Sequence, residues 1–202
     1  MIVADDGPDA ETAAVVERLA CEAARRGVAL RYVAVCGGAH GPAAARNAGW
    51  RQARGPIIAF TDDDCAPDSG WLSAGVAAMT EGVAGVSGRL IVPRGAPGCA
   101  SGCARPTDYE RNAALLANAE FITANCFYRR DALAAIGGLD ERFPVAWRED
   151  SDLAFTLIER GARLSYSPDA LVTHPIRPAP WGVSLPQQRR SMYNALLYRK
   201  HP

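Results

Sequence analysis

The sequence lacks long apolar runs and has no excess charge of either sign. None of its apolar stretches approaches the ~20 residues that a membrane-spanning helix needs, and its first residues lack the basic and apolar regions of a signal peptide. The 22 basic and 22 acidic residues cancel, so bulk electrostatics does not indicate a nucleic-acid partner. These absences favour a cytoplasmic protein, with weak peripheral contact at the cytosolic face of a membrane as an alternative for the basic C-terminal segment.

The cysteines also lack a pattern that would indicate a disulfide framework or a zinc site. Six are scattered along the chain, and although Cys99 and Cys103 lie close together, no second Cys or His pair stands at zinc-finger spacing. In a reducing compartment we expect free thiols. The chain has no internal repeat, and 202 residues with 49% hydrophobic content are enough to form the core of one domain.

Strand-like and helix-like segments alternate along the chain. Apolar residues at helical spacing, followed by Gly27, predict a helix over 10–26, and Pro42 in a first helical position predicts another over 42–54. The remaining expected helices span residues 70–80, 131–136 and 150–160. The expected strands span residues 1–4, 30–35, 56–61, 83–92, 121–128, 163–166 and 171–173. Such alternation is typical of an α/β sheet with parallel strands.

Two stretches stand outside this alternation. Residues 93–107 are rich in Gly, Pro, Ala and Cys without a period, which indicates a loop. After a proline-rich stretch, residues 181–202 form a basic segment. We expect this segment to be a helical tail, separate from a domain over residues 1–180.

An acidic run follows the apolar segment at residues 57–60. Asp62, Asp63 and Asp64 are three consecutive carboxylates at the predicted end of a strand. Two carboxylates one residue apart, here Asp62 and Asp64, can hold a hard divalent ion such as Mg²⁺ or Mn²⁺ that is shared with substrate phosphates. The alternative is a solvated acidic turn before the next helix, because short acidic turns are common.

Several separated motifs surround this run in a fixed order. The segment GPAAARNAG at 41–49 precedes it, and WREDSD at 147–152 and LVTHP at 171–175 follow it. In order and spacing these motifs resemble the family 2 glycosyltransferases, inverting enzymes of the GT-A fold that use nucleotide-diphosphate sugars. The resemblance covers residues 2–174. It implies an α/β fold of the Rossmann-like GT-A type, with a mixed, mainly parallel sheet flanked by helices.

The resemblance implies a metal site at the acidic run. Asp62 and Asp64 match the family's DxD motif, His174 falls where many such enzymes have a third metal ligand, and Asp63 falls on the side of the nucleotide donor. Cys65 departs from the family, which often carries an acidic residue there. The alternative for His174 is an exposed histidine at a strand end.

The same resemblance assigns the nucleotide of the donor to two other segments. It places the nucleoside against Asp6, with Asp5 in reserve, because a carboxylate there accepts a hydrogen bond from the base. It assigns nucleotide contacts to Arg46 and Asn47 in the predicted helix. The alternative for Arg46 is an exposed helix residue that pairs with a carboxylate.

Glu149 and Asp150 resemble the family's ED motif at a helix start, which makes them the catalytic pair, with Asp150 as the general base. An inverting displacement needs a base near the acceptor hydroxyl, opposite the leaving group, and a helix dipole would hold Asp150 ionised. A plain helix N-cap is the alternative for Asp150. Asn125 and Trp147 fall on the family's acceptor side, where Trp147 would stack on a sugar or belong to the core.

The chain departs from the family at its start. Members usually begin with an apolar strand and a helix before the strand that is equivalent to residues 1–4, and these are absent here. In the family this first strand is central in the sheet. Its loss would leave unpaired strand edges, so we expect a marginally stable chain that forms a homodimer or has the gap filled by another segment.

The leading hypothesis is a metal-dependent, inverting glycosyltransferase of the hexosyltransferase type, with Mn²⁺ or Mg²⁺ as cofactor. It would move a sugar from a nucleotide-diphosphate sugar to a hydroxyl of a carbohydrate, lipid-linked or small-molecule acceptor. The alternative, favoured by the missing strand, is a non-catalytic nucleotide-sugar-binding remnant or interaction module. A nucleotidyltransferase is less favoured, because no Gly-rich basic phosphate loop opens the domain.

Overall fold

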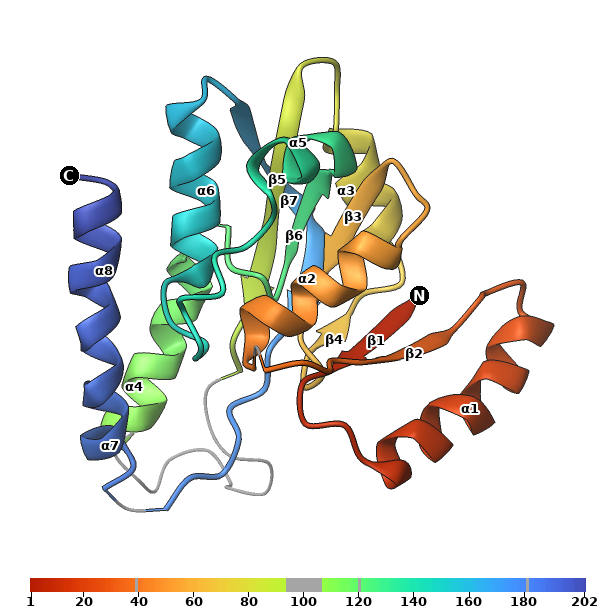
Figure 1. Cartoon of the computed structure of the whole chain (residues 1–202), viewed down its shortest axis with the longest axis horizontal. Helices are drawn as coiled ribbons and strands as arrows, with labels where there is room; N and C mark the ends of the chain where they lie inside the picture. Colours follow the sequence, from red (N-terminus) through yellow and green to blue (C-terminus); the bar gives the residue numbers. More distant parts are fainter. Residues whose placement is uncertain (39, 94–106, 120, 181) are drawn as a thin grey trace.

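The computed structural model describes residues 1–38, 40–93, 107–119, 121–180 and 182–202, and its strands form two sheets (Figure 1). The smaller sheet pairs β1 (Ile2–Asp5) in parallel with β2 (Arg31–Ala34). The larger sheet has the strand order β3-β6-β5-β7-β4. Its strands are β3 (Ile57–Phe60), β4 (Ala66–Pro67), β5 (Val83–Ile91), β6 (Cys126–Arg129) and β7 (Arg163–Thr173).

The larger sheet is mixed. β5 and β7 pair in parallel, whereas β6 is antiparallel to both β3 and β5, and β4 is antiparallel to β7. β3, β5 and β7 therefore run in one direction, and β6 and β4 run in the other. An α/β fold with a mixed sheet flanked by helices is thus confirmed, but three of the four pairings in the larger sheet are antiparallel, so this sheet is not mainly parallel.

The helices begin and end largely where the sequence predicts. Pro42 is the first residue of α2, and Asp9 caps α1 by accepting a hydrogen bond from the Thr12 amide at 2.8 Å. A helix that was not predicted, α4, starts with a capping box between Thr107 and Glu110. The helices are α1 (Ala10–Arg25), α2 (Pro42–Gln52), α3 (Trp71–Ala78), α4 (Asp108–Ala114), α5 (Arg130–Ile136), α6 (Glu149–Glu159), α7 (Ser184–Gln188) and α8 (Met192–Lys200), with 3-10 turns η1 (Leu115–Asn118) and η2 (Arg189–Ser191).

Two strand predictions need correction. The strand expected over 121–128 begins only at Cys126, because the amide of Asn125 closes a turn onto the carbonyl of Ile122 at 3.0 Å. The two short strands expected over 163–166 and 171–173 form one strand, β7. Its register against β5 jumps after Ser167, so the strand carries a bulge that the alternation of residues does not reveal.

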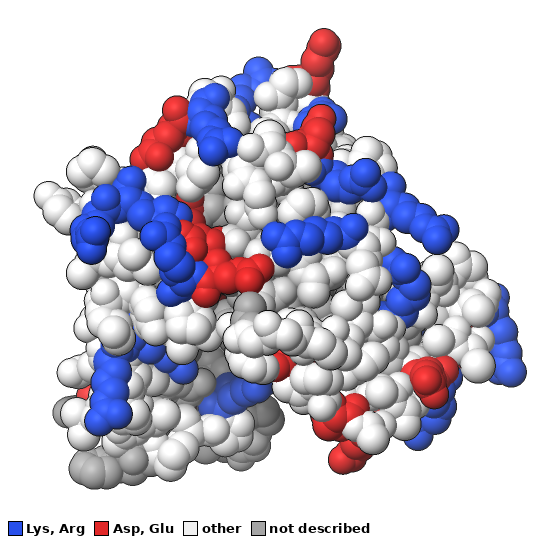
Figure 2. Space-filling model, in the orientation of Figure 1, with Lys and Arg blue, Asp and Glu red and all other residues white. Residues whose placement is uncertain are grey.

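Most of the expected loop over 93–107, together with Cys99 and Cys103, lies outside the described residues. The four described cysteines are free thiols. Within the described ranges, no helix is both long and apolar enough to cross a bilayer. On the face drawn in Figure 2, basic and acidic side chains are interspersed without a continuous field of one sign.

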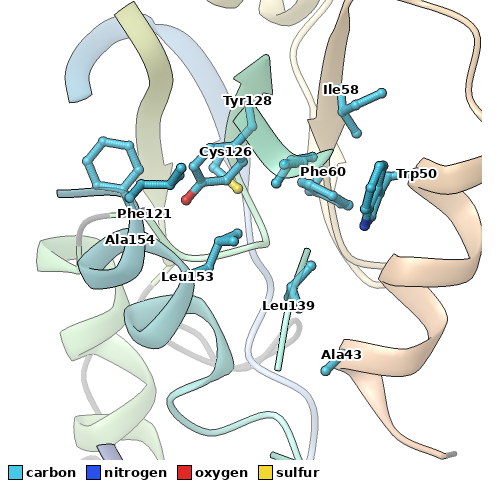
Figure 3. Packing of buried hydrophobic residues seen from close by; sticks show 12 residues of the cluster. Ala43, Trp50, Ile58, Phe60, Phe121, Cys126, Tyr128, Leu139, Leu153 and Ala154 are labelled. Carbon is cyan, nitrogen blue, oxygen red and sulfur yellow. The ribbon is translucent and has the colours of Figure 1, made fainter. Parts of the chain in front are cut away.

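Two buried clusters cover the two faces of the larger sheet. Phe127 and Tyr128 are consecutive on β6, so their side chains point to opposite faces, and both are fully buried. Phe127 packs with Trp71 of α3, with ring centroids 5.1 Å apart. Gly75 of α3 lies over the same ring, where a Cβ would overlap it. Tyr128 belongs to the other cluster, whose members come also from α2, α5 and α6 (Figure 3).

Among the described residues, the outer edges of β1 and β3 have no partner strand, like those of β2 and β4 at the other ends of the two sheets. β1 pairs only with β2, and β3 pairs only with β6. The amide of Arg130 donates to the carbonyl of Pro56 at 2.8 Å, and residues alternate along an antiparallel ladder, so the amides of Ile57 and Ala59 face the open edge of β3. This division fits the expectation that a strand between β1 and β3 is absent from the chain.

The open edge leads to a prediction about hydrogen exchange. We expect the amides of Ile57 and Ala59 to exchange at least about tenfold faster than those of Ile58 and Phe60, which face β6, a difference of about 1.4 kcal/mol in opening free energy. NMR-detected exchange on the full chain would measure all four rates. Equal protection at the four amides would mean that another segment or a second copy pairs with this edge.

Candidate active site

The acidic turn lies where β3 leaves the sheet. The amide of Cys65 closes the turn onto the carbonyl of Asp62 at 3.2 Å, and the chain then pairs with β7 as β4. Because Ala66 pairs with Thr173, the turn lies opposite the end of β7, where His174 follows. The register of a two-residue strand thus brings the predicted third ligand to the predicted DxD motif.

These two segments form a candidate metal site. One ligand atom each from Asp62, Asp64, Cys65 and His174 lies within 4.8 Å of the others. The Nδ1 of His174 is 3.1 Å from the carbonyl oxygen of Pro175, which can only accept, so Nδ1 carries the proton of the neutral ring. The lone pair of Nε2, 3.9 Å from Oδ1 of Asp64, is therefore oriented for coordination.

The thiol of Cys65 fits this site less well than its neighbours. Burial, and then the charges of Asp62 and Asp64, raise the pKa of Cys65 to about 12. A cysteine binds metals as the thiolate, so a protonated thiol contributes little. The donor set fits a hard ion held by carboxylate oxygens and an imidazole nitrogen, such as Mn²⁺ or Mg²⁺.

Arg46 joins this turn to the start of α6. Its guanidinium, 14% exposed, donates to Oδ1 of Asp62 at 2.6 Å and to Oε1 of Glu149 at 2.9 Å. The predicted alternative, an arginine paired with carboxylates, therefore describes its present contacts, although the side chain is half-buried rather than exposed. Arg46 fixes the distance between the two acidic motifs.

Glu149 and Asp150 occupy the first turn of α6 in different environments. Glu149 is 3% exposed, and burial, followed by the charge of Asp150, raises its pKa to about 7, against the opposing effect of Arg46. Its Oε2 is buried without a hydrogen-bond partner in the described part of the chain. Burial also raises the pKa of Asp150, which is half-buried. The N-cap of α6 is Arg148, so Asp150 lies inside the helix and is not its N-cap.

Asn194 of helix α8 forms hydrogen bonds with the two residues that precede Glu149. The Oδ1 of Asn194 accepts hydrogen bonds from Nε1 of Trp147 at 2.9 Å and from Nε of Arg148 at 2.8 Å. Arg148 has a left-handed backbone conformation with φ of 75°, which is uncommon outside glycine. Trp147 is 38% exposed, so its side chain is available on the surface rather than in the core.

The C-terminal end of α8 is joined to α6 by charge. Nζ of Lys200 lies 2.5 Å from Oδ1 of Asp152 and 2.6 Å from Oδ2 of Asp140. His201 approaches Asp152 and Glu159 through its two ring nitrogens at 3.1 and 2.6 Å. The tail therefore stabilises the helix that carries Glu149 and Asp150. This contact could not be predicted, because the tail residues have no assigned motif and their partners lie far along the chain.

A hollow of about 380 Å³ lies over the acidic turn. Its charged lining comprises Asp62, Asp63, Asp64, His174, Arg46, Arg177 and Arg190. Asp63 has a side chain 92% exposed, which suits its predicted donor-side position. Arg177 was not predicted, since it lies in the proline-rich stretch, where nothing distinguishes it from other surface arginines. Arg190 lies in the basic tail, to which the sequence assigns no chemistry.

Asp5 and Asp6 lie at the end of β1 and do not line this hollow. The carboxylate of Asp5 accepts from the amide of Gly7 at 3.0 Å and from the hydroxyl of Tyr32 at 2.8 Å. Oδ2 of Asp6 accepts from the amide of Gly41, just before α2, at 2.7 Å. Asp6 thereby ties β1 to the helix that carries Arg46, and its predicted nucleoside contact stays a prediction.

Two predicted contact residues are instead structural. Asn47 is 1% exposed and uses its whole amide inside the protein, with Nδ2 donating to the Leu139 carbonyl and to Glu141, and Oδ1 accepting from Trp50 and the Leu139 amide. A residue with no free donor or acceptor cannot add a contact to a nucleotide.

Asn125 is likewise 1% exposed. It accepts from Nε1 of Trp71 at 2.8 Å and donates to the carbonyls of Arg89 and Ala170. It fastens β6 to the bulge of β7, so its predicted place on the acceptor side is wrong. Both errors share a cause, because a buried, fully paired asparagine and an exposed contact asparagine look alike in a sequence.

The solved structures to which this chain is similar have the GT-A fold. A mannosyltransferase from Pyrobaculum calidifontis, PcManGT, in complex with GDP-Man and Mn²⁺, matches with a TM-score of 0.66 and 21% identity over 98% of this chain and 53% of that chain. TarS from S. aureus in complex with UDP-GlcNAc matches with a TM-score of 0.60 and 18% identity over 89% and 50% of the two chains. The expected GT-A fold is confirmed.

The sequence relatives are named glycosyltransferases. The pre-mycofactocin glycosyltransferase of Mycobacterium tuberculosis is 35% identical over 142 residues, which are 66% of this chain and 30% of that protein. Glycosyltransferase AglE of Haloferax volcanii is 31% identical over 143 residues, 68% of this chain and 45% of that protein. The chain thus spans less than half the length of these relatives. The family model described as glycosyl transferase family 2 matches residues 1–137, so this chain belongs to glycosyl transferase family 2.

Proposed function

We propose that this chain is the catalytic domain of a metal-dependent, inverting glycosyltransferase that moves a sugar from a nucleotide-diphosphate sugar to an acceptor hydroxyl. The observation that carries the proposal is the ion pairing of Arg46 with both Asp62 and Glu149, which joins the candidate metal-ligand set to the residue next to the candidate base, Asp150. The names of the relatives, and the GDP-Man and Mn²⁺ in the PcManGT structure, support the same assignment.

On the donor side, Asp62, Asp64 and His174 would hold the ion. A divalent cation there would offset the negative charge that develops on the departing diphosphate. Arg46 pairs with Oδ1 of Asp62 and so leaves Oδ2 for coordination. The carboxylates are therefore oriented before any ligand arrives, which reduces the cost of assembling the site.

On the acceptor side, Asp150 would act as general base. It takes the proton of the acceptor hydroxyl as that oxygen attacks the anomeric carbon, while the bond from this carbon to the diphosphate oxygen breaks on the opposite face. Glu149 is buried against Arg46, whereas Asp150 is only half-buried, so its carboxylate is the better placed of the two to meet a substrate. Trp147, exposed three residues earlier, is placed to stack on an acceptor sugar.

A donor-binding module without catalysis is a second candidate, supported by the open edges of β1 and β3. The predicted nucleoside contacts Asp5 and Asp6 lie at the end of β1, in the smaller sheet. Titration with UDP and GDP in the presence and absence of Mn²⁺, followed by an assay for diphosphate release from a panel of nucleotide sugars, separates the two candidates. Binding without release would favour the module.

The first functional prediction concerns the ion. Asp62→Ala or Asp64→Ala should abolish Mn²⁺-dependent binding of nucleoside diphosphates, because each removes a coordinating carboxylate. Isothermal titration calorimetry measures this loss. Asp169→Ala is a matched control, since Asp169 is exposed in the β7 bulge, and it should bind like the wild type. Unchanged binding in the Asp62 and Asp64 variants would reduce the acidic run to a surface turn.

The second prediction separates binding from chemistry. Asp150→Asn should leave donor affinity nearly unchanged and lower turnover by roughly 10²-fold or more, the scale of losing a general base. Donor affinity from calorimetry and diphosphate release from the same preparation give both quantities. A parallel loss of affinity and turnover would indicate a structural role for Asp150.

The third prediction concerns pH. Burial raises the pKa of Asp150 above its ordinary value of 3.8, and a general base acts only when ionised. Activity should therefore fall on acidification, with an apparent pKa above 3.8 in the profile of kcat/KM. The residual activity of Asp150→Asn should lack this acid limb. An acid limb that persists unchanged in the variant would assign the titration to another group.

A further inference from the structure

Arg177 forms ion pairs with two carboxylates of the acidic turn, one of which, Asp64, belongs to the candidate metal site. It follows β7 in an extended segment without regular structure. Its Nε lies 2.8 Å from Oδ2 of Asp64, and its Nη2 lies 3.3 Å from Oδ1 of Asp63. Asp64 thus faces His174 through Oδ1 and Arg177 through Oδ2, so the guanidinium neutralises carboxylate charge that would otherwise attract an ion to this site.

The two arginines on the acidic turn are held differently. Arg46 is 14% exposed and pairs with carboxylates from two elements, Asp62 and Glu149, whereas Arg177 is 57% exposed on an irregular segment. Solvent screens an exposed ion pair, and such pairs stabilise little. A divalent cation can therefore displace Arg177 from Asp64, while Arg46 stays in place.

The charge balance indicates where Arg177 goes. Asp62, Asp63 and Asp64 carry three negative charges, and Arg46 and Arg177 offset two of them. A bound divalent ion together with Arg46 balances the three carboxylates, so the displaced guanidinium adds a net positive charge to the hollow, with the exposed Asp63 as its remaining partner on the turn. It remains in the hollow, which Arg190 also lines, beside the space above the ion. A planar guanidinium there matches the geometry of phosphate oxygens.

We infer that Arg177 is a tethered counter-ion that competes with the metal for Asp64 and, once displaced, binds the diphosphate of the donor. This inference rests on the proposed function. In this arrangement the guanidinium screens the acidic turn before the ion arrives. The ion and the diphosphate then bind cooperatively. The ion replaces Arg177 at Asp64, and the diphosphate replaces Asp64 as the partner of Arg177.

Two titrations on the full chain test the inference, and Arg177→Ala should change the two binding affinities in opposite directions. Without nucleotide, Arg177→Ala should bind Mn²⁺ about two- to fivefold more tightly than the wild type, the scale of an exposed ion pair. With saturating Mn²⁺, the same variant should bind UDP or GDP about tenfold or more weakly, the scale of a charge-assisted hydrogen bond. Electron paramagnetic resonance of free Mn²⁺ and calorimetry measure the two constants.

Matched variants keep the test specific. Arg189→Ala removes a nearby exposed arginine that does not line the hollow, and it should leave both constants unchanged. Arg177→Lys keeps the charge without the planar fork and should give intermediate values. Thermal melts should show that Arg177→Ala unfolds like the wild type.

The outcomes separate this inference from the proposed function. If the wild type binds neither Mn²⁺ nor a nucleoside diphosphate, both fail. If the wild type binds both, but Arg177→Ala leaves Mn²⁺ affinity unchanged or weakens both constants together, the inference about Arg177 fails and the proposed function stands.

Discussion

The site depends on one half-buried guanidinium. Arg46 reaches from α2 to Asp62 after β3 and to Glu149 at the start of α6, and these residues come from three separate parts of the chain. Removing the guanidinium would leave both carboxylates without this charge partner, so the two acidic motifs depend on the same side chain. The position of α2 is in turn fixed by Asp6 at its start and by Asn47 against the 139–141 segment.

Much of the fold and part of the site follow from the sequence. The spacing of apolar residues and the positions of turn residues predict most helices and strands, because these elements are determined by residues close in sequence. Pro42 begins α2, and the apolar segment 57–60 forms β3. The acidic run and the ED pair are equally local. Their meeting is not, because it depends on Arg46 and on the register of β4 against β7, neither of which leaves a trace in residue spacing.

The errors also have a physical source. Asn47 and Asn125 satisfy buried backbone and side-chain groups across long sequence separations, and a motif match cannot tell such a residue from one that meets a ligand. The tail shows the converse. It has no motif, yet Asn194 and Lys200 contact the two ends of the segment that carries Glu149 and Asp150. Support of this kind is visible only after packing.

The paired side chains of β6 have a consequence for how the molecule comes apart. Because Phe127 and Tyr128 are neighbours on one strand and each belongs to a different buried cluster, neither cluster can open without disturbing the backbone that anchors the other. The five-stranded sheet should therefore melt as a single cooperative unit. The pair β1 and β2 lies outside that unit, joined to it through α2. A protein built this way can loosen the side that bears Asp5 and Asp6 while the acidic turn and α6 stay assembled, so partial unfolding would separate the end of β1 from the candidate metal site.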